Sequence, residues 1–492
     1  MHLPHRLPAL LAALLLSAPM LAPAADQPTR PNLLFILAED IGPQLGCYGA
    51  PLVQTPHLDA LAARGVRYTR AFTTAPVCSA SRSAIMTGMY QTSIGAHHHR
   101  TWQWNKRPLP AGARTLTDCL RDAGYFTANL AAPGGKKARK ENTGPSGLKI
   151  TGADGTGKTD FNFIAERPFD GISWKERAPG QPFFAQISIN ESHKGDGWVL
   201  ARSKDSPVGH VEAARVQLPP YYPDHPVARE EYANYLDAVA LMDHYVGEVL
   251  ARLERDGLAG NTIVVFMGDN GQCLFRSKQF LYDGGIHVPL IIAWPDRRRA
   301  GTVDDQLVSA IDVTAALIGL AGARPAPAMQ GRDFLAPGTM PRTHVFAARD
   351  RMDESTDRMR AVRTADWKYI RNYLPAIPYL QYNAYKEKSY PTWNLVKELA
   401  RAGQLTPEAA AFAAPRKPLE ELYDLRADPH EVRNLAADPA HAARLRELRA
   451  LVDRWVVESG DQGAQMEDPL DIFRGYNGRL PDEPGDKKGS AK

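Results

Sequence analysis

A repeated pattern, a continuous apolar run that ends in acidic or amide residues, limits the folds open to this chain. Such runs occupy residues 32–37, 182–189 and 261–267. A strand without alternating polar positions is typically buried on both faces, as in a parallel sheet covered by helices. Helical stretches separate the runs. The sequence therefore predicts an α/β fold in which helices sandwich a large mixed, mainly parallel sheet.

Further elements follow from the same criteria. We expect strands at residues 66–72, 126–131 and 288–294, and helices at residues 55–65, 115–123, 230–257 and 312–320.

The pattern of predicted strands and helices changes after Pro341. Residues 360–372 and 421–425 look like strands of a smaller sheet, and residues 440–458 like a late amphipathic helix. We predict a domain over residues 26–345, a smaller C-terminal α+β subdomain over 346–475 and a disordered tail over 476–492.

The first 25 residues have the pattern of a signal peptide. Arg6 forms a basic start, residues 7–21 are apolar, and residues 22–25 are small. The apolar run is too short to span a bilayer, which argues against stable membrane insertion, although an uncleaved anchor is the alternative. We expect an exported protein, periplasmic or secreted. A formal net charge of +4 over 492 residues gives no reason to expect a nucleic-acid partner.

The chain has few cysteines. They are Cys47, Cys78, Cys119 and Cys273, too few for a disulfide framework in a chain of this length. If Cys78 has a chemical role, at most one bridge is left.

Cys78 lies in an unusual stretch, residues 73–83, four positions before Arg82. Pro76 ends the preceding element, and Ser79 or Ser81 is expected to cap a helix. Cys78 would then lie at a helix N-terminus, where main-chain N–H groups favour an anion. The alternative is a small buried apolar residue.

The polar ends of the three apolar runs come together if the strands are parallel. They are Glu39 and Asp40, residues 190–193, and Asp269 with Asn270. Oxygen ligands of this kind suit Ca²⁺, or Mg²⁺, better than zinc. The alternative is that the strand ends are not neighbours.

The residues around Cys78 resemble a known family. The motif Cys78-Ser79-Ala80-Ser81-Arg82, with Thr87-Gly88 downstream, is similar to the nucleophile motif of type I sulfatases, in the alkaline-phosphatase-like superfamily. The similarity runs from about residue 31 to about residue 434. It implies an alkaline-phosphatase-like fold and a Cys78 that a maturation enzyme oxidises to formylglycine.

The resemblance also implies a metal site. Calcium would be held by Glu39, Asp40, the modified Cys78, Asp269 and Asn270. Glu39 stands where the family usually has Asp.

Sulfate-binding residues are implied in the same way. They would be Lys158, His193 and Lys278, but Asp160 stands where the family's Lys-x-His pattern has its histidine. In the implied mechanism a hydroxyl of the hydrated aldehyde attacks sulfur, and His193 protonates the leaving group. Arg82, Lys158 and Lys278 stabilise charge on the sulfuryl oxygens, and sulfate then leaves by elimination.

The stretch after the nucleophile helix is a candidate for substrate binding. His97, His98 and Arg100 could hold a sulfated sugar, although a metal site or a polar surface loop is an equal alternative. Asp160 and Arg349 are further candidate contacts.

Residues 39–43, the Cys78 stretch and residues 94–97 look similar to bacterial sulfatases of the heparan N-sulfatase type, and this resemblance suggests the substrate. It implies a sulfated saccharide, a glycosaminoglycan such as heparan sulfate. The alternatives are an O-sulfatase for another sulfated polysaccharide, a phosphonate or phosphodiester hydrolase of the same superfamily, and an inactive glycan-binding homologue.

Overall fold

The computed structural model describes residues 30–101, 106–133, 142–143, 149–150, 157–465 and 467–468. The predicted signal peptide and the predicted tail lie outside this part of the chain. The described residues from Pro31 onward belong to one compact unit. Among the described residues, no helix has the length and apolar character needed to cross a membrane.

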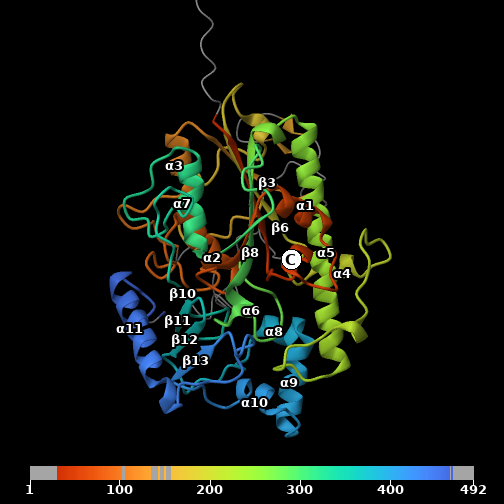
Figure 1. Cartoon of the computed structure of the whole chain (residues 1–492), viewed down its shortest axis with the longest axis vertical. Coiled ribbons are helices and arrows are strands. Elements are labelled where there is room, and N and C mark those ends of the chain that lie inside the picture. Colours follow the sequence, from red (N-terminus) through yellow and green to blue (C-terminus); the bar gives the residue numbers. More distant parts are fainter. Residues whose placement is uncertain are drawn as a thin grey trace, which may run out of the picture. The chain divides into compact units, whose positions relative to one another are not determined.

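The larger sheet has the strand order β3-β6-β1-β7-β8-β2-β9 (Figure 1). All pairings are parallel except those of β8, which runs antiparallel to β7 and β2. The predicted mixed, mainly parallel sheet is therefore confirmed. Its strands are β1 (Asn32–Ala38), β2 (Val66–Phe72), β3 (Phe126–Ala131), β6 (Phe183–Ile189), β7 (Thr262–Gly268), β8 (His287–Ala293) and β9 (Thr302–Ser309).

Helices cover both faces of this sheet. Alternate residues of β1 enter two different cores: Leu34 and Ile36 belong to one, Leu33 and Phe35 to the other. Figure 1 shows α1 and α5 on one side of the strands and α3 and α7 on the other. The helices of these layers are α1 (Pro56–Arg64), α2 (Cys78–Thr87), α3 (Leu116–Asp122), α4 (Asp196–Ala201), α5 (Pro226–Arg255) and α7 (Ala310–Leu320).

A smaller antiparallel sheet forms the C-terminal part. Its strands are β10 (His344–Arg349), β11 (Met359–Thr364), β12 (Trp367–Asn372) and β13 (Glu420–Asp424), in that order. The single strand expected over residues 360–372 is a hairpin, β11–β12. The predicted domain limits stay predictions.

The other strands and α-helices of the described chain lie outside these layers and sheets. They are β4 (Asn142–Thr143), β5 (Lys149–Ile150), α6 (Asp283–Ile286), α8 (Ala384–Ser389), α9 (Pro391–Arg401), α10 (Pro407–Phe412) and α11 (Ala442–Glu458). The last of these packs on the smaller sheet through Leu448 and Val452.

Candidate active site

The carboxyl ends of β6, β1 and β7 lie side by side. In the strand register, Ala38 is opposite Ile189 on one side and Gly268 on the other. Main-chain hydrogen bonds continue this register beyond the strands, because Glu39 N–H donates to the Ile189 carbonyl at 2.9 Å. The polar residues that follow the three strands therefore meet at one edge, as the sequence predicts.

Cys78 is the first residue of α2 and faces this edge. Val77 is the N-cap, so the expected cap at Ser79 or Ser81 is wrong. The Cys78 Sγ lies 3.6 Å from the Lys278 Nζ and 4.0 Å from an Asp40 carboxylate oxygen. Burial raises the pKa of the Cys78 thiol to about 12, so the encoded side chain is a poor nucleophile at neutral pH.

Arg82, one helical turn after Cys78, joins all three strand ends. Its Nε donates to Asp269 at 3.0 Å, its Nη2 to Glu39 at 3.1 Å and its Nη1 to the Ser188 hydroxyl at 2.9 Å. Ser188 is a site residue that the sequence analysis missed, although it lies in a predicted strand. The i, i+4 spacing places Cys78 and Arg82 on one helix face, which explains how both reach the same edge.

Two lysines supply further positive charge from loops. The Lys158 Nζ lies 2.8 Å from Glu39, and the Lys278 Nζ lies 2.6 Å from Asp40. Burial favours the neutral form of Glu39, but Lys158 and Arg82 outweigh it and hold the pKa of Glu39 well below its usual range. Burial also disfavours the ionised form of Asp40. The charge of Lys278 outweighs this effect, so the pKa of Asp40 is lowered as well.

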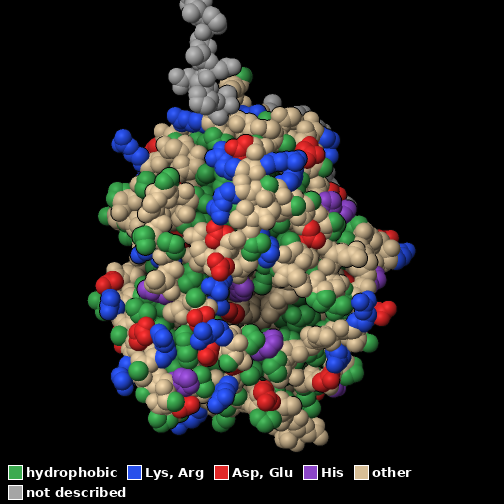
Figure 2. Space-filling view, in the orientation of Figure 1, with side chains coloured by type: hydrophobic (Ala, Val, Ile, Leu, Met, Phe, Trp, Pro, Cys, Tyr) green, Lys and Arg blue, Asp and Glu red, His purple; other side chains and the backbone are tan. Residues whose placement is uncertain are grey.

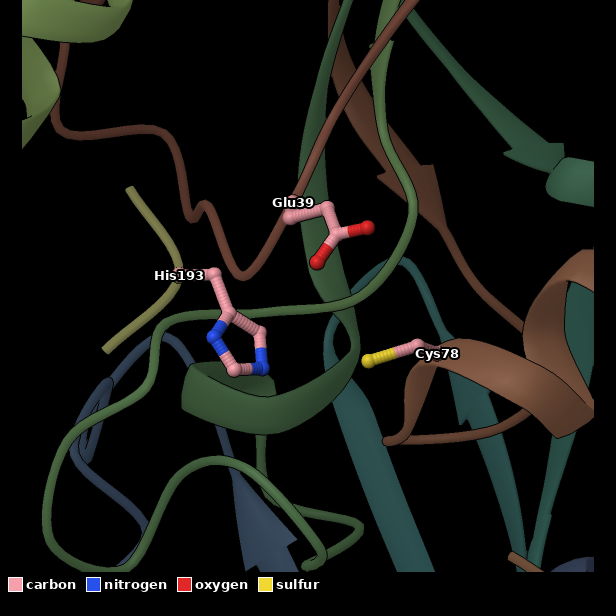
Figure 3. Close-up of side chains that lie close together, drawn as sticks. All are labelled: Glu39, Cys78 and His193. Atoms are coloured by element: carbon pink, nitrogen blue, oxygen red, sulfur yellow. The ribbon is translucent and has the colours of Figure 1, made fainter. Parts of the chain in front are cut away.

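His193 lies at the more open side of the group. Figure 3 shows its imidazole turned toward Glu39 and Cys78, and candidate ligand atoms of these three residues lie within 4.8 Å of one another. The His193 Nε2 is 3.7 Å from Asp40, and its side chain is 26% exposed. Burial, followed by the nearby Lys278, lowers the pKa of His193, so the free site favours the neutral ring.

The site has the oxygen ligands that a hard divalent cation needs. Asn270 donates from Nδ2 to Asp40 at 2.9 Å, and its amide oxygen Oδ1 is buried without a hydrogen-bond partner among the described residues. Burial, together with the nearby carboxylates of Glu39 and Asp40, raises the pKa of Asp269 to about 6. Asp40 has a left-handed backbone, with φ of 53°, a conformation that is uncommon for a residue other than glycine. A cation beside the unpaired amide oxygen would satisfy that oxygen and relieve the crowding.

The predicted substrate residues separate into two groups. Asp160 and Arg100 lie beside the site: Asp160 is 3.3 Å from Lys158, and Arg100 N–H donates to the Ser79 hydroxyl at 3.1 Å. His97 is buried against the ring of His98, at 4.2 Å between centroids, so it offers no surface to a sugar.

Carboxylates lie beside His98 and His99. The His98 Nδ1 lies 3.4 Å from Glu467, and the His99 Nδ1 lies 2.9 Å from Asp353. The one metal-ligand group found among the described residues does not include this histidine run.

Arg349 is placed differently from the sequence expectation. It is 1% exposed, its Nη1 is 3.5 Å from Asp357, and its guanidinium lies over the ring of Phe280. Its ion pair is thus buried inside the protein, and the expected sugar contact is not what the structure offers. The four cysteines are all free.

Two family models match the chain. The sulfatase model matches residues 31–323, and the model described as N-sulphoglucosamine sulphohydrolase, C-terminal, matches residues 271–392.

Curated relatives cover nearly the whole length. The chain is 34% identical to an ulvan-active sulfatase from Formosa agariphila, over 92% of this chain and 78% of that protein. It is 27% identical to the human N-sulphoglucosamine sulphohydrolase, over 87% of this chain and 90% of that protein.

A solved structure shows the same fold. It is of a protein in complex with its substrate, D-glucosamine-2-N,6-O-disulfate, with a TM-score of 0.58, 17% identity, and coverage of 88% of this chain and 98% of that one. At this identity the likeness establishes the fold and not the substrate.

Proposed function

Since this chain belongs to the sulfatase family, we propose that it removes sulfate from a glycosaminoglycan, with an N-sulfated glucosamine of the heparan type as the first candidate. We further propose that Cys78 is converted to formylglycine and that Ca²⁺ is the cation. Export by the segment of residues 1–25 is part of the same proposal, because a polysaccharide substrate lies outside the cell.

The comparisons favour a sulfated glycan and leave two candidates for its identity. The C-terminal family match and the human relative both carry the name N-sulphoglucosamine sulphohydrolase. The bacterial relative with the higher identity acts on ulvan. An O-sulfatase for an ulvan-type polysaccharide is therefore the second candidate.

The chain's own residues suit sulfuryl transfer. A hydrated aldehyde at residue 78 would supply a hydroxyl nucleophile, and a divalent cation held by Glu39, Asp40, Asp269 and Asn270 would supply positive charge. Lys158 and Lys278 are fixed by Glu39 and Asp40, so their ammonium groups are oriented before the substrate arrives. A sulfate that binds beside them requires little further movement of either lysine.

His193 is the proposed proton donor. Its side chain is partly exposed at the opening and has Asp40 on its inner side. A bound sulfate places negative charge beside the ring and favours the imidazolium form. That proton can then pass to the leaving nitrogen or oxygen of the sugar.

One observation carries the proposal most directly. Lys278 Nζ lies 3.6 Å from a buried thiol whose pKa is about 12. An anion-binding group is thus aimed at a side chain that is inert as encoded, which is expected if the side chain is modified before it reacts.

Mass spectrometry of the tryptic peptide over residues 71–82 tests this, with protein from the native host or protein made together with a formylglycine-generating enzyme. The expected result is a thiol-to-aldehyde mass loss at Cys78. An intact thiol in the native protein would refute the mechanism.

Sulfate release from a substrate panel then identifies the reaction. We expect turnover of N-sulfoglucosamine units, with O-sulfated ulvan oligosaccharides and phosphonate monoesters as the competing classes. The control is Cys78→Ala. Faster release of phosphonate or phosphate would identify a hydrolase of the other class, and binding without release would identify an inactive glycan-binding homologue.

A further inference from the structure

Lys386, in the short helix α8, is buried in an unusual environment. It is fully buried, yet no carboxylate of the described chain lies within ion-pair distance of its ammonium. Its Nζ donates to the main-chain carbonyl of Lys278 at 3.0 Å. The other buried lysines face carboxylates: Lys278 faces Asp40, Lys368 faces Asp283 and Glu431, and Lys417 faces Asp357.

Aromatic rings form the rest of this environment. The Lys386 Nζ lies 4.0 Å from the ring centroid of Tyr390, 5.6 Å from that of Trp393 and 5.8 Å from that of Phe280. Cation–π contacts and one charge-assisted hydrogen bond offset part of the cost of burying the ammonium. A leucine or methionine would fill the same space without that cost, so the hydrogen bond to Lys278 is the feature that needs this lysine.

The carbonyl that Lys386 holds belongs to a constrained turn. The neighbouring residues Arg276 and Gln279 both have left-handed backbones, with φ of 58° and 77°. Lys278 N–H donates to the Gln272 carbonyl at 3.0 Å, and Gln279 N–H donates to the Pro76 carbonyl at 2.8 Å. Such a turn persists only where its surroundings determine it. Lys386 supplies the contact on the carbonyl side.

The same helix also contacts the open side of the site. The ring of Tyr385 lies 6.2 Å from the ring of His193, and its centroid is 5.7 Å from the Lys278 Nζ. Helix α8 therefore contacts the main chain of Lys278 through Lys386 and its side chain through Tyr385.

We propose that Lys386 is a positioning residue that acts through Lys278: its ammonium fixes the Lys278 carbonyl, and so directs the Lys278 side chain to the sulfate bound beside residue 78. The proposal rests on the proposed function in one respect, that sulfate binds at this site. A displaced side chain at a reacting centre can lower rates by as much as about a hundredfold, so a distant main-chain contact can have a large effect.

The test compares Lys386→Met with Lys417→Met. Both substitutions remove a buried ammonium, but the Lys417 ammonium pairs with Asp357, and no hydrogen bond or ion pair within the described residues joins it to the site. We expect Lys386→Met to weaken binding of inorganic sulfate, measured by calorimetry, and to lower kcat/KM by about tenfold or more. Lys417→Met should change neither, even if it lowers the unfolding temperature as much.

A double-mutant cycle with Lys278→Met decides whether Lys386 acts through Lys278. If it does, Lys386→Met has little further effect on sulfate affinity or turnover once Lys278 is replaced. Additive losses, or a Lys386→Met protein with wild-type sulfate affinity, would overturn the inference. Sulfate binding without turnover in the wild type would refute the proposed function and leave the binding arm of this test intact.

Discussion

The carboxyl group of Glu191, two residues before His193, lies in an environment that disfavours its charge. Its Oε2 is buried and has no hydrogen-bond partner among the described residues. Burial raises the pKa of Glu191 from 4.5 to about 7. Between these values the folded protein keeps a proton that the unfolded chain has released. Unfolding free energy therefore falls as the pH rises through this window.

Glu191→Gln should remove this dependence. The variant should approach the wild type near pH 3, where Glu191 is protonated in both the folded and the unfolded wild type, and be more stable near pH 8, by on the order of 3 kcal/mol. Denaturant unfolding of both proteins over the pH range measures the difference. A constant difference at all pH values would show that Glu191 does not titrate in this way.

Asp160 places a negative charge beside a residue that should bind sulfate. Its carboxylate lies 3.3 Å from Lys158, and its side chain is 30% exposed. An acid there opposes the anion but can accept hydrogen bonds from sugar hydroxyl groups. We predict that Asp160→Asn raises KM for a sulfated disaccharide by about tenfold and leaves binding of inorganic sulfate unchanged or tighter.

An aryl sulfate without sugar hydroxyl groups is the matched control substrate for this variant. If Asp160→Asn impairs the aryl sulfate as much as the disaccharide, Asp160 serves Lys158 and not the sugar.

At the scale of elements, a segment after α11 holds the loop that follows α2. Gln462 N–H donates to the Thr92 carbonyl at 3.0 Å, and its Nε2 donates to the Ser93 carbonyl at 2.9 Å. Glu467 accepts from Arg351 at 2.9 Å and lies 3.4 Å from His98. Residues 462–467 thus hold the loop that leads from α2 to Arg100.

Glu467→Gln should loosen this loop. Arg351 is buried, so loss of its charged partner is expected to cost on the order of 1–3 kcal/mol in unfolding free energy and to raise KM for the saccharide. Glu458→Gln, at the exposed end of α11, is the control and should change neither value. Wild-type KM in a destabilised Glu467→Gln would mean that the segment stabilises the fold without shaping the site.

The elements show where sequence patterns succeed and where they fail. The buried strands β1, β6 and β7 were predictable because an uninterrupted apolar run has few other uses. The edge strand β9 was missed, since its Asp304 and Asp305 break the apolar pattern. The start of α2 was misplaced because the Ser79 and Ser81 hydroxyls bond other segments, Ser81 donating to the Asp269 carbonyl and Ser79 accepting from Arg100.

At the scale of the molecule, sheet topology explains which site residues could be predicted. Glu39, Asp40 and Asp269 follow parallel neighbours, so strand order alone brings them together. Lys158 and Lys278 come from loops and were found through the family resemblance. The buried position of Arg349 was not predicted, because the sequence does not show that its guanidinium pairs with Asp357 in the core. Long-range pairing of this kind depends on packing that no local pattern encodes.

The charges of the whole site favour a bound divalent cation. Glu39, Asp40 and Asp269 converge with Arg82, Lys158 and Lys278, and the one buried acceptor left unpaired among them is the Asn270 amide oxygen, within the described chain. A cation bound only by the folded protein stabilises it, by about 2.7 kcal/mol at a concentration a hundred times Kd.

We therefore expect Ca²⁺ to raise the unfolding temperature of chelator-treated protein in a concentration-dependent way, even with Cys78 unmodified. Asn270→Ala should weaken this response, whereas Asn394→Ala, on α9, should keep it. An unfolding temperature indifferent to Ca²⁺ and Mg²⁺ would contradict a metal site at this edge of the sheet, because a cation bound by the folded protein must stabilise it.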